Sequence, residues 1–168
     1  MSGEPEPPAE VMWQGKYIRA WKRGRWEYVS RVGDVRAVVI FAEFEGKVIL
    51  IDQTRIALGR RCLELPAGLV GDEDPGATVE ETAVKELEEE TGFTASSVEM
   101  LGEFHASPGM LSEGFTLVRA HDVRPTGGGH EEDINVHLVP RGEIPAFVEQ
   151  MRGKGFAIDV KLLLFLKF

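Results

Sequence analysis

The chain has 168 residues and a mass of 18.6 kDa, enough for one domain and too few for two full catalytic lobes. Hydrophobic residues make up 43% and charged residues 28%, which excludes a disordered chain, and 19 Gly with 9 Pro favour many turns over a helical bundle. The net charge of −9 has the wrong sign for a protein that grips nucleic acid. A phosphate-bearing partner would therefore need divalent ions held on clustered carboxylates.

The sequence shows no signal for export or membrane insertion. Residues 1–10 are acidic and Pro-rich, which predicts a disordered tail rather than a signal peptide, and the apolar run 162–166 is far too short to cross a bilayer. Cys62 has no cysteine partner, and we interpret it as a small buried residue, with a reactive thiol as the alternative. We expect a cytoplasmic protein that binds neither membrane nor nucleic acid.

Strand patterns dominate the first 65 residues. Aromatic and charged residues surround a turn signal at Gly24, which predicts a small antiparallel β unit over residues 11–34. Residues 35–44 and 47–53 are β-branched and aliphatic, and the Glu45-Gly46 turn between them predicts a hairpin of the main sheet. A further strand is predicted over residues 60–65, before Pro66.

A helical period then covers residues 76–91, with Val79, Ala83 and Leu87 four residues apart and Gly92 as the stop. Strands are predicted at 98–104, 115–120 and 134–139, and a short helix at 145–150. The segment 160–168 would suit a helix capped by Asp159 or a buried strand, and we favour the helix. These elements predict an α+β protein with a mixed sheet covered by helices, not a regular βαβ fold.

Three glutamates, Glu86, Glu89 and Glu90, share one face at the end of the predicted helix. Like-charged pairs at this spacing cost roughly 0.2–0.5 kcal/mol each, and anions in a last turn oppose the helix dipole. The patch is either a solvated acidic face or a ligand set for a divalent cation, which would turn repulsion into attraction. The preceding turn, Pro66-Ala67-Gly68, favours the cation, because Pro66 withholds an amide donor and Gly68 permits unusual dihedrals, which leaves the Ala67 carbonyl free to face the carboxylates.

These motifs resemble the Nudix hydrolases, whose box reads Gly-x5-Glu-x7-Arg-Glu-U-x-Glu-Glu-x-Gly-U, with U a bulky apolar residue. Residues 85–93, Lys-Glu-Leu-Glu-Glu-Glu-Thr-Gly-Phe, match its second half at every specified position except the first, where Lys85 replaces Arg. The preceding Glu-Leu-Pro-Ala-Gly at 64–68 is similar to the branch that hydrolyses ADP-ribose and nucleotide sugars. The resemblance implies an α/β/α sandwich for residues 35–168, with a mixed sheet packed between helices.

The chain departs from the box at two positions. Counted back from Lys85, the first glutamate of the box falls on Ala77, and the stretch from Gly68 to that point is three residues too long. The loop 70–76 would absorb the insertion, and one of its acidic residues, Asp72, Glu73 or Asp74, could supply the missing carboxylate. Lys85 keeps the charge of Arg but lacks its planar fork. A catalytically weakened nucleotide-binding or regulatory domain is therefore an alternative to an active enzyme.

The resemblance also assigns roles outside the helix. Pro108 is similar to a downstream proline of ADP-ribose pyrophosphatases, although Pro-Gly is also an ordinary turn. In the loop before the strand 134–139, Glu132 would complete the metal site formed by the Ala67 carbonyl and the three glutamates. Glu131 or Glu132 would act on the attacking water, with His130 as a rival base because imidazole titrates near neutral pH.

The predicted substrate contacts come from three parts of the chain. Arg55 would bind a phosphate, or else is a surface arginine. The N-terminal unit would pair with a second subunit to form a homodimer, and its aromatic side chains would stack on a base or simply pack at a sheet edge. The loop 110–113 would contribute to base selectivity. The predicted substrate-binding residues are Trp26, Tyr28, Arg31, Arg55, Met110 and Glu113.

The implied activity is hydrolysis of the diphosphate in ADP-ribose or a related nucleoside diphosphate sugar, with Mg²⁺ or Mn²⁺ as cofactor. The products would be a nucleoside monophosphate and a sugar phosphate. Metal ions would neutralise the diphosphate and activate water near neutral pH. A Nudix enzyme for another nucleoside diphosphate derivative or a nucleoside triphosphate is a further alternative.

Overall fold

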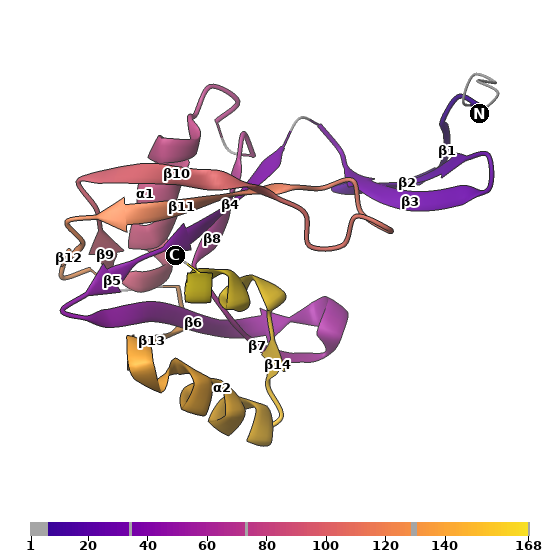
Figure 1. Cartoon of the computed structure of the whole chain (residues 1–168). Coiled ribbons are helices and arrows are strands. Elements are labelled where there is room, and N and C mark those ends of the chain that lie inside the picture. The colour runs from indigo at the N-terminus through magenta and orange to yellow at the C-terminus, as the bar shows by residue number, and fades with distance from the viewer. Residues whose placement is uncertain (1–6, 34, 73, 129–130, 168) are drawn as a thin grey trace.

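The computed structural model describes residues 7–33, 35–72, 74–128 and 131–167. In these residues the chain forms two larger sheets, a separate N-terminal sheet and a short strand pair, with helices packed against the larger sheets (Figure 1). Residues 1–6 of the predicted tail lie outside the described residues, and the first strand already begins at Glu10. No helix in the described ranges combines the length and the apolar character needed to cross a membrane.

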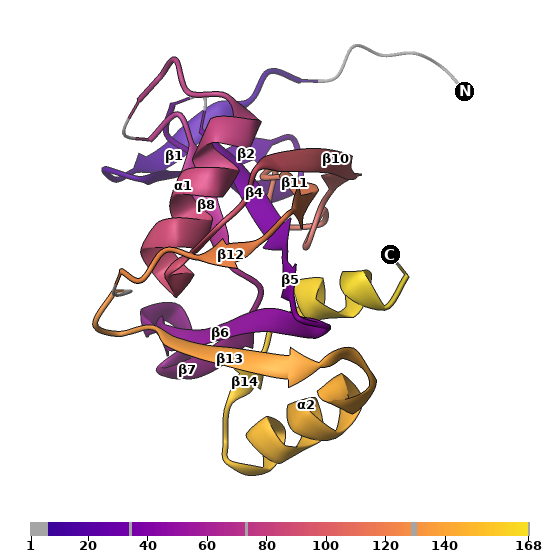
Figure 2. The same cartoon turned by 90° about the vertical axis from the view of Figure 1, so that its left-hand side faces the viewer.

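The first larger sheet carries α1 (Val79–Thr91) on one face (Figure 2). Its strands lie in the order β10 (Ser97–Phe104), β11 (Phe115–His121), β4 (Arg36–Phe41) and β8 (Ala67–Val70), and β11 runs parallel to β4. Alternate residues of β4 enter two different core clusters, since Val38 and Ile40 pack with Leu87 of α1 while Val39 and Phe41 pack with the second sheet. The strand is therefore apolar on both faces, which explains its central position.

The second larger sheet has β13 (Asn135–Pro140), β6 (Lys47–Arg55), β7 (Arg60–Glu64) and β14 (Ala157–Ile158) in this order, and β5 (Glu43–Phe44) also pairs with β6. The helix α2 (Ile144–Gly153) packs against β13 and β14. The predicted short helix at 145–150 is thus confirmed and is longer than expected. The segment Val160–Lys167, η3, is helical as favoured, but it is a 3₁₀ helix. Shorter elements are η1 (Ile56–Leu58), β9 (Phe93–Thr94), β12 (Arg124–Pro125) and η2 (Arg141–Glu143).

The hairpin predicted for residues 35–44 and 47–53 is only partly correct. The Glu45-Gly46 turn is present, and Glu45 and Gly46 have φ of 50° and 74°. Only β5 pairs with β6 across that turn, whereas β4 pairs with β11 and β8 in the other sheet. The chain changes sheet at Ala42, whose carbonyl accepts from the Ile49 N–H at 2.9 Å. Strand composition predicted the strand but did not identify its partner, because both apolar faces of β4 can be buried in either sheet.

The helix α1 is fixed at both ends. Thr78 accepts from the Glu81 N–H at 3.1 Å, and Glu81 accepts from the Thr78 N–H at 2.9 Å, which is a capping box. Gly92 ends the helix with φ of 72°, and its N–H donates to the Glu88 carbonyl. The predicted helix is confirmed, and its acidic last turn lies close to the start of β8.

The N-terminal sheet projects away from the two larger sheets (Figure 1). It consists of β1 (Glu10–Gln14), β2 (Ile18–Arg23) and β3 (Trp26–Arg31), all antiparallel, with the predicted turn at Gly24. The loop before β11 ties it to the core, because the Val29 N–H donates to the Met110 carbonyl at 2.9 Å and the Ser112 N–H donates to the Val29 carbonyl at 3.0 Å. The small antiparallel unit expected from the sequence is confirmed.

Candidate active site

The turn into β8 presents the Ala67 backbone to the acidic end of α1. The Ile40 N–H donates to the Pro66 carbonyl at 2.8 Å, and Ala67 lies opposite Val39 in the next register position. In an antiparallel ladder the residue next to a hydrogen-bonded pair directs its N–H and C=O away from the neighbouring strand. The Ala67 N–H accordingly donates to Oε2 of Glu90 at 2.9 Å. By the same rule, the Ala67 carbonyl is directed to this side of the strand, and its predicted role as a metal ligand stays a prediction.

Gly68 makes room for the carboxylate of Glu86. A Cβ at Gly68 would lie 2.2 Å from the Cδ and Oε1 atoms of Glu86. That carboxylate also accepts a hydrogen bond from the Leu69 backbone. Gly68 is not among the glycines with positive φ, so the expectation that it supplies unusual dihedrals is wrong. Its lack of a side chain is what the site requires.

Two of the three helix glutamates are withdrawn from solvent to different degrees: Glu86 is half-buried and Glu90 is buried. Glu90 is only 7% exposed. Burial raises the pKa of Glu90 to about 8, the charges of Glu86 and Glu131 act in the same direction, and the Ala67 N–H and Arg55 oppose it. Burial also raises the pKa of Glu86, helped by the charge of Glu89. The arrangement is unfavourable for bare carboxylates and would be relieved by a cation.

Glu89, the third helix glutamate, and Glu131 of the downstream loop lie in the same region as Glu86 and Glu90. We call these four glutamates the acidic group. Glu89 is exposed, its Oε2 lies 3.5 Å from Nζ of Lys85, and its carbonyl accepts from the Glu131 N–H at 3.3 Å. Lys85 therefore keeps an ionic role at the position where the box has Arg. Glu132 follows Glu131 in the sequence and is also exposed. No interaction between its carboxylate and Glu86 or Glu90 is found in the described part of the chain. His130 lies outside the described residues.

The carboxylate missing at Ala77 is not visibly replaced from the insertion loop. Oδ1 of Asp74 accepts from the Gly76 N–H at 2.8 Å within its own turn. Asp72 is exposed, and its charge acts on Lys16 of the N-terminal segment. Glu73 lies outside the described residues. The two loop carboxylates that are described therefore have other local partners.

Arg55 lies beside the acidic group and is held by Glu64. The sequence had not indicated a functional role for Glu64. Nε and Nη2 of Arg55 donate to the two carboxylate oxygens of Glu64 at 2.7 and 2.5 Å. Glu64 is only 3% exposed, and the charge of Glu90 also acts to raise the pKa of Arg55. A bidentate pair of this kind fixes the plane of a guanidinium. One feature of the sequence could have identified Glu64: it is a charged residue at the otherwise apolar end of the strand before Pro66.

The other predicted substrate residues lie on the N-terminal sheet and the loop attached to it. Tyr28 stacks on Trp21 with ring centroids 6.3 Å apart, while Trp26 is exposed. Arg31 forms an ion pair with Glu113, and Met110 is exposed in the loop next to β3. The sheet that carries Trp26 and Tyr28 projects away from the larger sheet on which α1 packs (Figure 1).

Cys62 takes no part in the site. The residue is buried, as interpreted from the sequence. Burial raises the pKa of its thiol to about 12, and the charge of Glu64 acts in the same direction. A thiol that stays protonated at neutral pH is a poor nucleophile, which argues against the alternative reading.

The acidic group fits a hard divalent ion by its chemistry. It offers only oxygen donors, from carboxylates and a backbone carbonyl, and these suit Mg²⁺ or Mn²⁺ rather than softer metals. Within the described ranges, no three His, Cys, Asp or Glu side chains form a group that could hold an ion as they stand. The space at Gly68, the raised pKa values of Glu86 and Glu90 and the oxygen donors are the features that favour a metal here.

The geometry and the family comparison agree on the class of protein. Residues 33–154 match the family model described as the NUDIX domain, and the chain therefore belongs to the Nudix family of hydrolases.

Individual relatives are similar over different shares of their length. A putative Nudix hydrolase 2 of Caenorhabditis elegans is 29% identical over 92% of this chain and 80% of its own length. An ADP-ribose pyrophosphatase of Bacillus subtilis is 39% identical over 55% of this chain and 47% of its own length. A crystal structure of an ADP compounds hydrolase superposes with a TM-score of 0.71 at 23% identity, covering 86% of this chain and 82% of that one. This last likeness confirms the fold.

We expect Gly68→Ala to weaken divalent-ion binding about ten-fold or more while leaving the fold stable. The new methyl group would displace the Glu86 carboxylate, and a flexible side-chain end can swing aside at little cost. Calorimetric titration with Mn²⁺ measures the affinity. Gly142→Ala is the matched control, because the space around Gly142 is open. Equal Mn²⁺ affinity of Gly68→Ala and the parent protein would contradict the role of this space.

Without divalent ions, the free energy of unfolding should fall as the pH rises from about 5 to about 8. The pKa of Glu90 in the folded state is raised from 4.5 to about 8, so the folded protein holds a proton that the unfolded chain has already lost. Urea unfolding in the presence of a chelator measures this slope. Glu90→Gln, which copies the protonated form, should show a flatter profile, and parallel profiles of the two proteins would speak against a perturbed Glu90.

Proposed function

We propose that this Nudix hydrolase is a pyrophosphohydrolase that uses Mg²⁺ or Mn²⁺ to split ADP-ribose or a related nucleoside diphosphate sugar. The observation that carries the proposal is the pair of desolvated glutamates, Glu86 and Glu90, held on the backbone of residues 67–69. The Bacillus relative, named an ADP-ribose pyrophosphatase, supports the choice of substrate.

The substrate needs a site that concentrates positive charge. The ions would be held by the Ala67 carbonyl with Glu86, Glu89 and Glu90, and Glu132 would complete the set. When bound, they supply charge neutralisation of the diphosphate and activation of water. Electrostatic stabilisation and positioning are the main catalytic devices in phosphoryl transfer.

The chain's own side chains would do the rest. Arg55, with its guanidinium plane set by Glu64, would donate to a phosphate oxygen. Glu131 or Glu132 would accept the proton of the water that attacks phosphorus. The anhydride P–O bond then breaks, which gives a nucleoside monophosphate and a sugar phosphate.

We also propose that the protein is a homodimer joined through the N-terminal sheet. Large apolar side chains on this sheet and its turns are between 44% and 63% exposed: Val11, Met12, Trp13, Tyr17, Ile18 and Trp26. An apolar surface of this kind on a projecting arm is typical of an association surface. In such a dimer, Trp26 and Tyr28 of one subunit would lie near the acidic group of the other.

A double substitution, Val11→Glu with Ile18→Glu, should convert the dimer to a monomer, because it buries charge in an apolar contact. Light scattering after gel filtration would give twice the 18.6 kDa chain mass for the parent and the single mass for the variant. Leu138→Glu alters an exposed apolar side chain on β13 and should leave the mass unchanged. A monomeric parent protein would overturn the dimer.

The purified protein should hydrolyse one or more members of a panel of ADP-ribose, ADP-glucose, GDP-mannose, NADH and diadenosine compounds when Mg²⁺ is present. Glu86→Gln should lower kcat by about 100-fold or more, because it removes a charged ligand of the proposed metal. Circular dichroism checks that the variant is folded. Nucleotide binding that survives Glu90→Gln without any turnover would favour the alternative of a regulatory domain, and an inactive parent protein would refute the proposed activity.

A further inference from the structure

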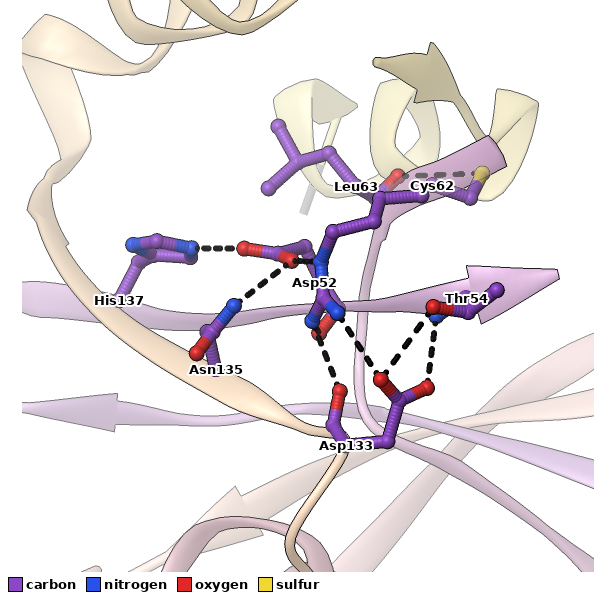
Figure 3. A network of polar contacts seen from close by, with 8 residues as sticks. Asp52, Thr54, Cys62, Leu63, Asp133, Asn135 and His137 are labelled. Carbon is purple, nitrogen blue, oxygen red and sulfur yellow. Dashed lines mark hydrogen bonds and ion pairs between the residues drawn. The ribbon is translucent and has the colours of Figure 1, made fainter.

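The acidic loop with Glu131 and Glu132 is fastened to the second sheet by the residue that follows it, Asp133. Oδ2 of Asp133 accepts from the Thr54 N–H at 3.0 Å, and Oδ1 accepts from the Thr54 hydroxyl at 3.2 Å and from Nη1 of Arg61 at 3.0 Å. Nη2 of Arg61 also donates to the Asp133 carbonyl at 2.7 Å. Figure 3 shows the Asp133 carboxylate facing Thr54 at the end of β6. Side chain and backbone of one loop residue are thus both held by the sheet.

Arg61 is itself fixed by a buried carboxylate. Its Nε donates to Oδ1 of Asp52, and its Nη2 donates to the Asp52 carbonyl at 2.8 Å. Asp52 is only 1% exposed and also accepts from Nδ2 of Asn135 at 3.1 Å and from Nε2 of His137 at 2.6 Å (Figure 3). Burial raises the pKa of Asp52, but the hydrogen bonds from His137, Arg61 and Asn135 more than offset this and leave its pKa below the ordinary value. We call Asp52, Arg61 and Asp133 the clamp.

The clamp differs from an ordinary surface ion pair. Exposed pairs contribute little, because two flexible side chains must be ordered for a weak attraction in water. Here Arg61 has already been ordered by the buried Asp52, so its remaining donors meet Asp133 without a further loss of side-chain freedom. Thr54 adds two donors from a regular strand. The position of Asp133 is therefore set by the sheet rather than by the loop.

This position decides where the two catalytic candidates lie. Asp133 is next to Glu132 and two residues from Glu131, whose N–H reaches the Glu89 carbonyl of α1. The turn is closed by the Ile134 N–H, which donates to the Glu131 carbonyl at 3.0 Å, and Ile134 is buried. On the other side, the loop is tied to the end of α1 at Thr126, whose N–H donates to the Gly92 carbonyl at 2.9 Å. The loop thus bridges α1 and the sheet, with the clamp as its anchor on the sheet.

We propose that Asp133 is a positioning residue, which acts through the clamp to set Glu131 against Glu86 and Glu90 and to fix the loop that also carries Glu132. The proposal rests on the proposed function for its catalytic consequence. Asp133 itself points to Thr54 and Arg61 and has no assigned contact with substrate or metal. Catalytic groups displaced by about 1 Å can lose on the order of 100-fold in rate.

The test is Asp133→Ala, followed by hydrogen exchange and by kinetics. We expect the amides of Glu131 and Ile134 to exchange at least about ten-fold faster, while the amides of β6 and β13 stay protected. We expect kcat to fall about 10- to 100-fold with KM changed less than about two-fold, because the clamp acts on the loop and not on the substrate. Asp133→Asn, which keeps one acceptor oxygen for Thr54, should recover part of both effects.

Two controls separate positioning from a general loss of stability. Glu99→Ala removes another exposed carboxylate, one paired with Arg119 and His121 on the first sheet, and should change neither readout. In the Glu131→Gln or the Glu132→Gln background, the kinetic effect of Asp133→Ala should shrink, because the glutamate that the clamp positions is no longer an effective base.

The outcomes are distinguishable. Unchanged exchange at Glu131 and Ile134 in Asp133→Ala overturns the clamp, whether or not the parent protein hydrolyses any diphosphate. A loosened loop with unchanged kcat overturns the positioning role. A parent protein that is inactive on the whole substrate panel refutes the proposed function and the catalytic consequence together, while the exchange result still decides whether Asp133 orders the loop.

Discussion

The placement of two carboxyl groups, the half-buried Glu86 and the buried Glu90, against the backbone at the start of β8 is the constraint on which the site depends. Each carboxylate receives a backbone N–H, from Leu69 and Ala67 respectively, so neither is left without a donor. These hydrogen bonds do not offset the desolvation, since both carboxyl groups keep raised pKa values. Three features meet at this point. The sheet edge supplies backbone N–H donors, a glycine without a side chain leaves space, and the last turn of the helix carries no basic residue. The geometry favours an occupant that carries positive charge.

The departures from the Nudix box leave this point unaltered. The insertion at residues 70–76 lies before the capping box, where Thr78 and Glu81 start α1 independently of the loop that precedes them. The last helical turn lies against the start of β8, where Glu90 accepts from the Ala67 N–H. Lys85 remains paired with Glu89 through a simple charge contact. The substitutions thus affect the beginning of the helix and its outer face more than the buried carboxylates.

Local patterns in the sequence predicted most of the longer elements and the shared acidic face at the end of α1. The period of Val79, Ala83 and Leu87 and the stop at Gly92 predicted α1, because a helix end is determined by neighbouring residues. The pairing of Arg55 with Glu64, and the clamp, in which Arg61 and Asp133 are 72 positions apart, could not be predicted from such patterns. They depend on strand register, which also decided that β4 leaves its expected partner. Gly68 was expected to matter because glycine permits unusual backbone dihedrals. The structure shows instead that it matters because it leaves space for the Glu86 carboxylate.

The bonds between β3 and the loop before β11 give the molecule a mechanical linkage. Val29 contacts Met110 and Ser112 through its backbone, and Arg31 holds Glu113, so β3 and the loop 110–113 are joined directly. In the proposed homodimer, a force applied to the N-terminal sheet by a neighbouring subunit would be transmitted to this loop without passing through the core. Subunit association and the base selectivity predicted for the loop would then not be independent traits, and evolution would be expected to alter the two together.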